Sequence, residues 1–299
     1  MHHSAQTRLA TLLLVALTAV WGSTFFLIHD LVETLPPVDF LAVRFTIAAV
    51  VMVVAFWRPL RALDQRQVAI GVGLGVLYGL AQIAQTQGLA TTPASVSGFI
   101  TGTYVVLTPV FTALILREKV AGSTWAAVAL ATVGLALLSL NGFSIGVGEA
   151  ITLLAAALYA LHIVGLGRYS ASEIAVGLSV VQMVVIAVLC LVGAAPGGIA
   201  LPQGTGQWAS VLYMVVFASI LALWAQTWAQ AHLPATRAAI IMTVEPVFAA
   251  FFAVTLGDES LTTRMLLGGA LVLTAMYAVE ILARRRPGEL PAEALHHEV

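Results

Sequence analysis

Apolar residues occur along the chain in ten long runs that are separated by short polar connections. Each run approaches the roughly 20 residues that a helix needs to cross the hydrocarbon core of a bilayer. The runs lack the alternation of apolar and polar residues that is typical of barrel strands. They predict ten transmembrane helices, at residues 9–28, 38–56, 68–88, 94–116, 123–140, 150–167, 174–193, 208–231, 235–256 and 265–283.

The composition agrees with this pattern. Of the 299 residues, 60% are hydrophobic and only 9% are charged, which is too apolar for a soluble domain of this length. The fold class is therefore an all-α polytopic membrane protein. The first run continues to about Ile28 without a cleavage site of small residues, so it is predicted to remain as a span. Residues 284–299 have no apolar period and are predicted to be a disordered tail.

Charges in the connections predict the orientation. With ten spans, eleven of the thirteen basic residues fall on one side, namely Arg8, Arg58, Arg61, Arg66, Arg117, Lys119, Arg168, Arg237, Arg284, Arg285 and Arg286. By the positive-inside rule this side is cytoplasmic. The opposite connections carry Asp30, Glu33, Asp39, Glu149, Asp258 and Glu259, with Arg264 as a basic exception. Residues 1–8 and 284–299 are thus predicted to be cytoplasmic, at a cell (inner) membrane.

An internal repeat relates residues 9–140 to residues 148–283. Its best match joins Thr108-Pro-Val-Phe-Thr-Ala113 to Glu245-Pro-Val-Phe-Ala-Ala250. Five spans per copy is an odd number, so the second copy must be inverted relative to the first. Inverted repeats with interrupted helices are typical of secondary transporters. Pro109 and Pro246 are therefore predicted to break their helices and to act as hinges.

The strongest candidate for function is Glu245, which lies in the middle of an apolar run next to Pro246. A carboxylate inside a membrane span is costly and is a functional-site hypothesis by default. Because burial disfavours the charged form of a carboxyl group, Glu245 is predicted to gain and lose a proton that couples to a substrate. The alternative is a structural carboxyl group that pairs with Arg44 or with a backbone group freed by Pro246.

Arg44 lies about six residues inside the second predicted span, or roughly 10 Å deep at helical rise. Three interpretations are open: an outer gate, the ion-pair partner of Glu245, or an arginine that extends to the outer headgroups.

Polar and aromatic residues at helical spacing predict a wet central cavity. Such a stripe runs along the fourth span, and shorter ones occur on the first, third, sixth and eighth spans. Polar residues that only hold helices together are the alternative. Besides Arg44 and Glu245, the predicted substrate-binding residues are Trp21, Tyr78, Gln82, Gln85, Thr101, Tyr104, Thr108, His162, Trp224 and Trp228.

Gly71, Gly75 and Gly79 are spaced by four on the third span. They predict a close helix–helix contact and not a nucleotide loop, because no strand precedes them. No sequence pattern of a hydrolase or an ATP-driven pump occurs, so the chain is predicted not to be an enzyme. No cofactor, metal or nucleic acid is expected.

Several segments together resemble the EamA branch of the drug/metabolite transporter superfamily. They are Val20-Trp-Gly-Ser-Thr-Phe-Phe26, Phe40-Leu-Ala-Val-Arg-Phe-Thr46, Gly88-Leu-Ala-Thr-Thr-Pro-Ala-Ser95, Phe99-Ile-Thr-Gly-Thr-Tyr-Val-Val106, Glu245-Pro-Val-Phe-Ala-Ala250 and Gly257-Asp-Glu259. The resemblance implies two inverted five-helix repeats around a cavity lined by spans 1, 3, 4, 6, 8 and 9. It also implies export of small metabolites such as amino acids, or of toxic compounds.

These features favour a secondary transporter that exports a small, amino-acid-like metabolite by proton-linked alternating access. The alternative within transport is a multidrug efflux antiporter for lipophilic cations. An intramembrane enzyme, as a different class, would need a catalytic constellation that is not seen. The expected partners are a small-molecule substrate and the lipid bilayer, and the expected assembly is a monomer or a homodimer.

Overall fold

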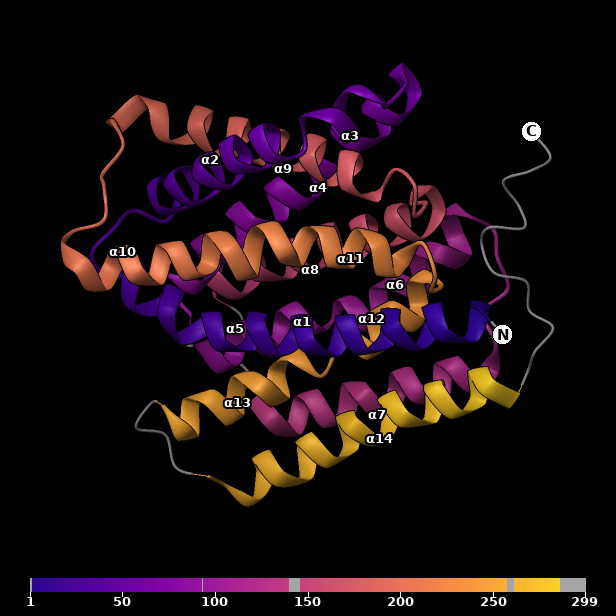
Figure 1. Cartoon of the computed structure of the whole chain (residues 1–299). Helices are drawn as coiled ribbons and strands as arrows, with labels where there is room; N and C mark the ends of the chain where they lie inside the picture. Colours follow the sequence, from indigo (N-terminus) through magenta and orange to yellow (C-terminus); the bar gives the residue numbers. More distant parts are fainter. Residues whose placement is uncertain (1, 93, 140–145, 257–260, 286–299) are drawn as a thin grey trace.

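The computed structural model describes residues 2–92, 94–139, 146–256 and 261–285, and every regular element within them is a helix (Figure 1). Predictions for Asp258, Glu259, Arg286 and most of the C-terminal tail lie outside these residues.

The first half contains α1 (His2–Val32), α2 (Pro37–Ala55), α3 (Trp57–Arg61), α4 (Gln65–Leu89), α5 (Ala94–Gly102), α6 (Tyr104–Ile115) and α7 (Gly122–Ser139). The second half contains α8 (Val147–Tyr169), α9 (Ala175–Ala194), η1 (Ala195–Gly197), α10 (Gly204–Tyr213), η2 (Met214–Leu221), α11 (Ala222–Gln230), α12 (Ala235–Met242), α13 (Glu245–Thr255) and α14 (Thr263–Arg285). Among the described residues, seven helical segments are long and apolar enough to cross a membrane. Three shorter apolar helices coincide with the fourth, fifth and tenth predicted spans. The ten apolar runs are therefore all helical.

Local sequence explains where several helices begin. The Asp64 carboxylate accepts a hydrogen bond of 2.7 Å from the backbone N–H of Gln67, whose side chain accepts one of 3.0 Å from the N–H of Asp64. This reciprocal cap satisfies two backbone donors at the start of α4. Pro37 is the first residue of α2, a position where proline loses no hydrogen bond.

The helices form a central group with a pair along each edge (Figure 1). The helix α7 lies against α14 along one edge, and α2 lies against α9 along the other. Each edge thus joins a span of the first half to its counterpart in the second. The central contacts also occur in matched pairs. The third span (α4) packs on the sixth (α8), and the eighth (α11) packs on the first (α1) in the corresponding way. This packing is that of two inverted five-helix repeats.

The glycine stripe of α4 makes the close contact that its spacing predicts. A Cβ atom added at Gly71, Gly75 or Gly79 would lie 2.8 Å from a side-chain atom of α9 in each case. At Gly75 the backbone of Gln182 is also only 3.0 Å away. Small residues therefore set the separation of α4 and α9.

A valine at Gly75 is expected to destabilise the protein by about 1–3 kcal/mol, because it overpacks this contact. Gly73→Ala is the matched control on the same helix, since nothing lies within 4 Å of its added Cβ. Thermal unfolding of the purified variants in detergent would measure both. An unfolding temperature for Gly75→Val equal to that of Gly73→Ala would contradict the close-packing role.

Two predicted spans are interrupted inside the bundle. The ninth is divided into α12 and α13 at Thr243 and Val244, directly before Glu245. The fourth is divided into α5 and α6 at Thr103. The predicted break at Pro109 is therefore wrong in position, because Pro109 lies inside α6. A proline can be accommodated within a transmembrane helix when neighbouring groups satisfy the freed carbonyl.

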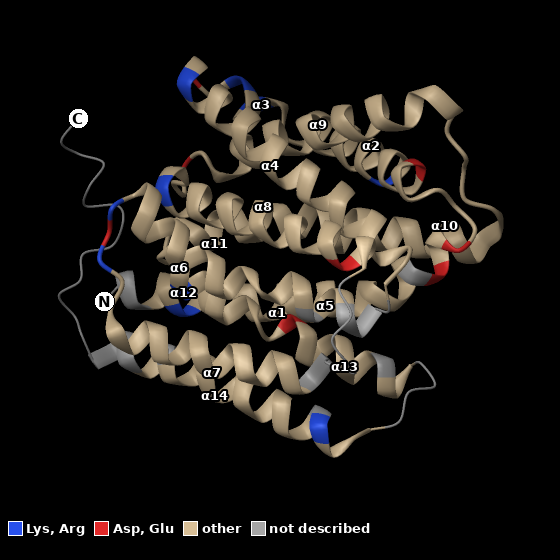
Figure 2. Cartoon of the chain, turned by 180° about the vertical axis from the view of Figure 1, so that it is seen from behind, with Lys and Arg blue, Asp and Glu red and all other residues tan. Residues whose placement is uncertain are grey.

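Charged side chains separate along the bundle as the loop pattern predicts. The basic residues gather mainly at the end of the bundle that carries α3 and the N-terminus, and the acidic ones mainly at the opposite end (Figure 2). The band between the two ends carries few charges among the described residues, as a bilayer core requires. Arg44 and Glu245 lie buried within this band.

Candidate functional site

A cavity lies at the centre of the bundle, between the two repeats. Its volume is about 60 Å³, counted as the space that the centre of a water molecule can occupy, which is room for a few water molecules. Its walls come from α1, α4, α5, α6, α8, α11, α12 and α13, with Arg44 added from α2. These elements belong to the six spans that the family resemblance implies, together with the second span.

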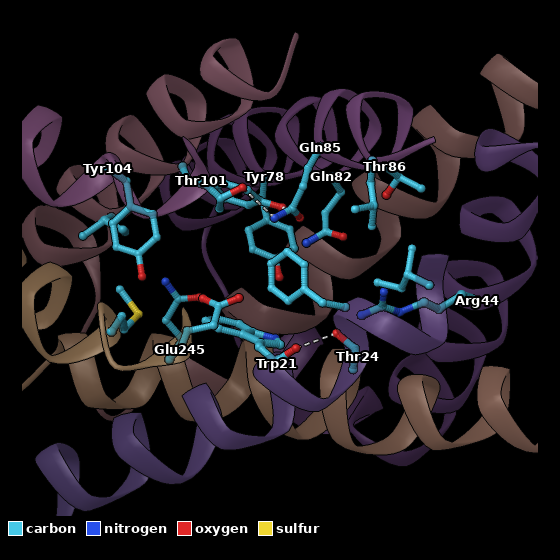
Figure 3. Close-up of a pocket in the computed structure, with 17 residues that line it drawn as sticks. Trp21, Thr24, Arg44, Tyr78, Gln82, Gln85, Thr86, Thr101, Tyr104 and Glu245 are labelled. Atoms are coloured by element: carbon cyan, nitrogen blue, oxygen red, sulfur yellow. Dashed lines mark hydrogen bonds between the residues drawn. The ribbon is translucent and has the colours of Figure 1, made fainter. Parts of the chain in front are cut away.

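Eight of the twelve predicted substrate-binding residues line this cavity: Trp21, Arg44, Tyr78, Gln82, Gln85, Thr101, Tyr104 and Glu245. Figure 3 shows Arg44 toward one end and Tyr104 and Glu245 toward the other. The cavity is thus bounded by a cationic side chain at one end and an acidic side chain at the other.

Glu245 is the first residue of α13, at the point where the ninth span is interrupted. Its side chain is 8% exposed and faces the cavity (Figure 3). In the described part of the chain, no cation forms an ion pair with it and no hydrogen bond reaches its carboxylate. A carboxyl group held in this way is available to a proton or to a ligand.

The α1 helix approaches α13 most closely beside Glu245. A Cβ atom at Gly22 would lie 2.7 Å from Cβ of Phe248 and 2.9 Å from the carbonyl oxygen of Glu245. Only glycine allows this approach. Trp21, the neighbour of Gly22 on α1, is thereby brought to the cavity wall.

Arg44 is buried and is only 2% exposed. Its Nε donates a hydrogen bond of 2.8 Å to Ser219 Oγ, and its Nη2 donates one of 3.0 Å to the carbonyl of Ala218. The interpretation of Arg44 as a headgroup-facing residue is therefore wrong. The proposed ion pair with Glu245 is also absent among the described residues, because the two side chains lie toward opposite ends of the cavity (Figure 3).

The partner of Arg44 is the π-helical segment η2, which the sequence pattern did not reveal. Ser219 Oγ donates to the carbonyl of Met214, five residues earlier, over 2.9 Å. The Ala218 carbonyl accepts from Trp21 Nε1 over 3.3 Å as well as from Arg44. The wider turn of a π-helix exposes carbonyl groups, and such turns are frequent at functional sites.

A chain of side-chain hydrogen bonds crosses one wall of the cavity. Tyr159 Oη donates to Gln85 Oε1 over 2.8 Å. Gln85 Nε2 donates to Thr101 Oγ1 over 3.1 Å (Figure 3). These bonds join α8, α4 and α5. They hold three polar groups at the cavity surface, where an apolar lining would otherwise be expected in a membrane protein.

Three predicted lining residues lie elsewhere because of helix geometry. Thr108 is buried and donates to the carbonyl of Tyr104 over 2.7 Å. Its predicted position assumed one continuous helix, and the break at Thr103 changes the register. Trp224 and Trp228 also lie outside the cavity, because residues two positions from Gln226 face the opposite side of α11.

His162 is the fourth predicted residue that does not reach the cavity. It is fully buried, and its Nε2 forms a hydrogen bond of 2.8 Å with Gln182 Oε1. Its ring packs behind Tyr78, with 4.9 Å between the ring centroids. His162 supports the wall from outside.

Nine lining residues were not among those predicted: Thr24, Phe25, Ile28, Thr86, Leu89, Tyr159, Ile163, Gln226 and Met242. Thr86 and Gln226 had a usable signal. Thr86 continues the helical face of Gln82, and Gln226 precedes Gln230 by four residues in an otherwise apolar span. Within the described residues, no group of three or more His, Cys, Asp or Glu residues converges as a metal site would require.

The fold and the sequence are similar to those of known proteins. A crystal structure of another protein superposes with a TM-score of 0.75 at 17% identity, covering 93% of this chain and 99% of the other, so the fold is shared. An uncharacterized transporter from Archaeoglobus fulgidus is 32% identical over 90% of this chain and 84% of its own length. The uncharacterized inner membrane transporter YedA of Escherichia coli K12 is 26% identical over 83% of each chain. The EamA-like transporter family matches twice, at residues 8–140 and 146–280. The chain is therefore a membrane transporter that belongs to the EamA-like transporter family.

Proposed function

We propose that the protein exports a small polar or amphipathic metabolite across the cell membrane by alternating access, in exchange for protons that bind Glu245. The observation that carries this proposal is the Glu245 carboxylate, which faces the cavity between the two repeats without an ion-pair partner among the described residues. A buried ionisable group in a membrane span marks a substrate or proton pathway.

The interrupted helices support alternating access. The breaks at Thr103 and Thr243 lie in corresponding spans of the two repeats, and both spans line the cavity. Discontinuous helices at a repeat interface allow one repeat to rock against the other around a fixed site.

The lining favours an amino-acid-like substrate. Arg44 at one end suits a carboxylate, Glu245 at the other suits an amine, and the aromatic rings between them suit an apolar side chain. The runner-up is efflux of lipophilic cations, which the rings of Trp21, Tyr78 and Tyr159 favour through cation–π contacts. Transport is favoured over enzymatic activity, because the matching family and the two relatives described above are named as transporters.

The charge distribution supports cytoplasmic termini, because the N-terminus lies at the basic end of the bundle (Figure 2) and basic loops stay in the cytoplasm. Transport out of the cell would then begin from the end of the bundle that carries α3.

Reconstitution into liposomes that contain a pH-sensitive dye would test the proposal. We expect external amino acids to drive movement of protons across the membrane, and a neutral sugar to drive none. A response to tetraphenylphosphonium alone would favour the efflux of lipophilic cations. Substrate movement that is insensitive to an imposed pH gradient would contradict proton exchange.

A further inference from the structure

Gln226 lines the cavity and is only 2% exposed. In the described part of the chain, its Oε1 has no hydrogen-bond partner. Buried polar atoms are nearly always paired, and an unpaired one in a native structure calls for a missing ligand or water. Nothing in the proposed mechanism above uses this atom.

The direction of the Gln226 amide is set by a relay to α8. Gln230 Nε2 donates to the carbonyl of Ile163 over 2.8 Å, which leaves Gln230 Oε1 as an acceptor. Gln226 Nε2 donates to that oxygen over 3.1 Å. A backbone carbonyl can only accept, so the order of donors and acceptors is fixed along the chain. The oxygen of Gln226, and not its nitrogen, is therefore the amide atom that is left without a partner.

Two other residues that line the cavity carry a polar group without a partner. Among the described residues, Tyr104 Oη is buried without a hydrogen-bond partner, and no hydrogen bond or ion pair reaches the Glu245 carboxylate. Gln226, Tyr104 and Glu245 all line this one cavity, and they come from α11, α6 and α13.

We propose that Gln226, Tyr104 and Glu245 form a subsite for the substrate's headgroup, and that this headgroup is a primary ammonium. An ammonium group carries several N–H donors and a positive charge. One N–H would meet the Gln226 oxygen and another the Glu245 carboxylate, and the Tyr104 oxygen can accept a third. A quaternary ammonium has the same charge but no N–H, so it would leave the Gln226 oxygen unpaired.

Gln226 is thus the residue that gives selectivity for primary over quaternary ammonium groups. Glu245 alone would not distinguish the two groups, because both carry the same charge. The inference rests on the proposed transport function, because it assigns part of that substrate site. Binding and transport can nevertheless be measured separately, so the failure of one does not imply the failure of the other.

The test is calorimetric titration of the purified full-length protein in detergent with three probes: butylammonium, butyltrimethylammonium and 1-butanol. We expect butylammonium to bind, and the other two to bind about tenfold more weakly or worse, since each lacks either the N–H donors or the charge. Equal binding of butylammonium and butyltrimethylammonium would overturn the proposal, and so would the absence of butylammonium binding.

Gln226→Met tests the assigned residue, because methionine retains the length of the side chain and removes the acceptor. The affinity for butylammonium should fall about tenfold, to that of butyltrimethylammonium, and the affinity for the latter should not change. Gln87→Met is the control, since Gln87 is exposed and lies outside the cavity. An unchanged preference for butylammonium in Gln226→Met would overturn the assignment. If this variant does not fold, the comparison of the three probes on the unmodified protein still decides the proposal.

Discussion

Replacing Glu245 with glutamine is expected to abolish proton-linked transport while the protein folds normally. The amide has nearly the same size and can occupy the same position at the start of α13. It cannot bind or release a proton, and it cannot form a charge-assisted hydrogen bond, whose loss reduces affinity about tenfold or more. Substrate-driven proton movement in liposomes should therefore fall to the level of empty vesicles.

Glu149→Gln is the matched control for this experiment. Glu149 lies at the start of α8, outside the central cavity, and its carboxylate accepts a hydrogen bond of 2.9 Å from the backbone N–H of Gly146. Glutamine can make the same cap, so transport and stability should both persist. Proton movement in Glu245→Gln equal to that in Glu149→Gln would refute the coupling role of Glu245.

Replacing Arg44 with methionine is expected to abolish transport at little cost in stability. Arg44 is a buried cation without an ion pair among the described residues, and such a charge carries a large desolvation penalty. Its acceptors keep other contacts, because Ala218 still accepts from Trp21 and Ser219 still donates to Met214. The unfolding temperature should therefore change by no more than about 3 °C.

Arg44→Lys distinguishes charge from geometry. Lysine keeps the positive charge but cannot donate from two fixed positions to Ser219 and Ala218 at once. We expect at least about a tenfold loss of transport in Arg44→Lys as well, measured per folded protein in liposomes. Normal transport by both variants, or a large fall in stability with normal transport by the folded fraction, would show that Arg44 only braces the π-helical segment.

The candidate site could be predicted from the sequence only in part. Glu245, Arg44, Tyr78, Gln82 and Gln85 stand out because polar and charged residues are rare in apolar spans. Helical spacing also predicted a shared face, and it succeeded on α4, where the helix is continuous. It failed for Thr108 because the helix is interrupted at Thr103, five residues earlier. No proline adjoins Thr103 in the sequence, so nothing there signals this break.

The amino-acid sequence by itself determined the class of protein, the ten apolar helices, the two inverted repeats and the acid at their centre. These follow from the length of apolar runs, the sorting of loop charges and one proline next to a carboxylate, all of which are local. Only the tertiary structure decided that Arg44 binds the π-helical segment instead of Glu245, and that Gln226 lines the cavity with its oxygen unpaired among the described residues. Those facts depend on which faces of different helices pack against one another. The spacing of residues along a single helix does not specify that packing.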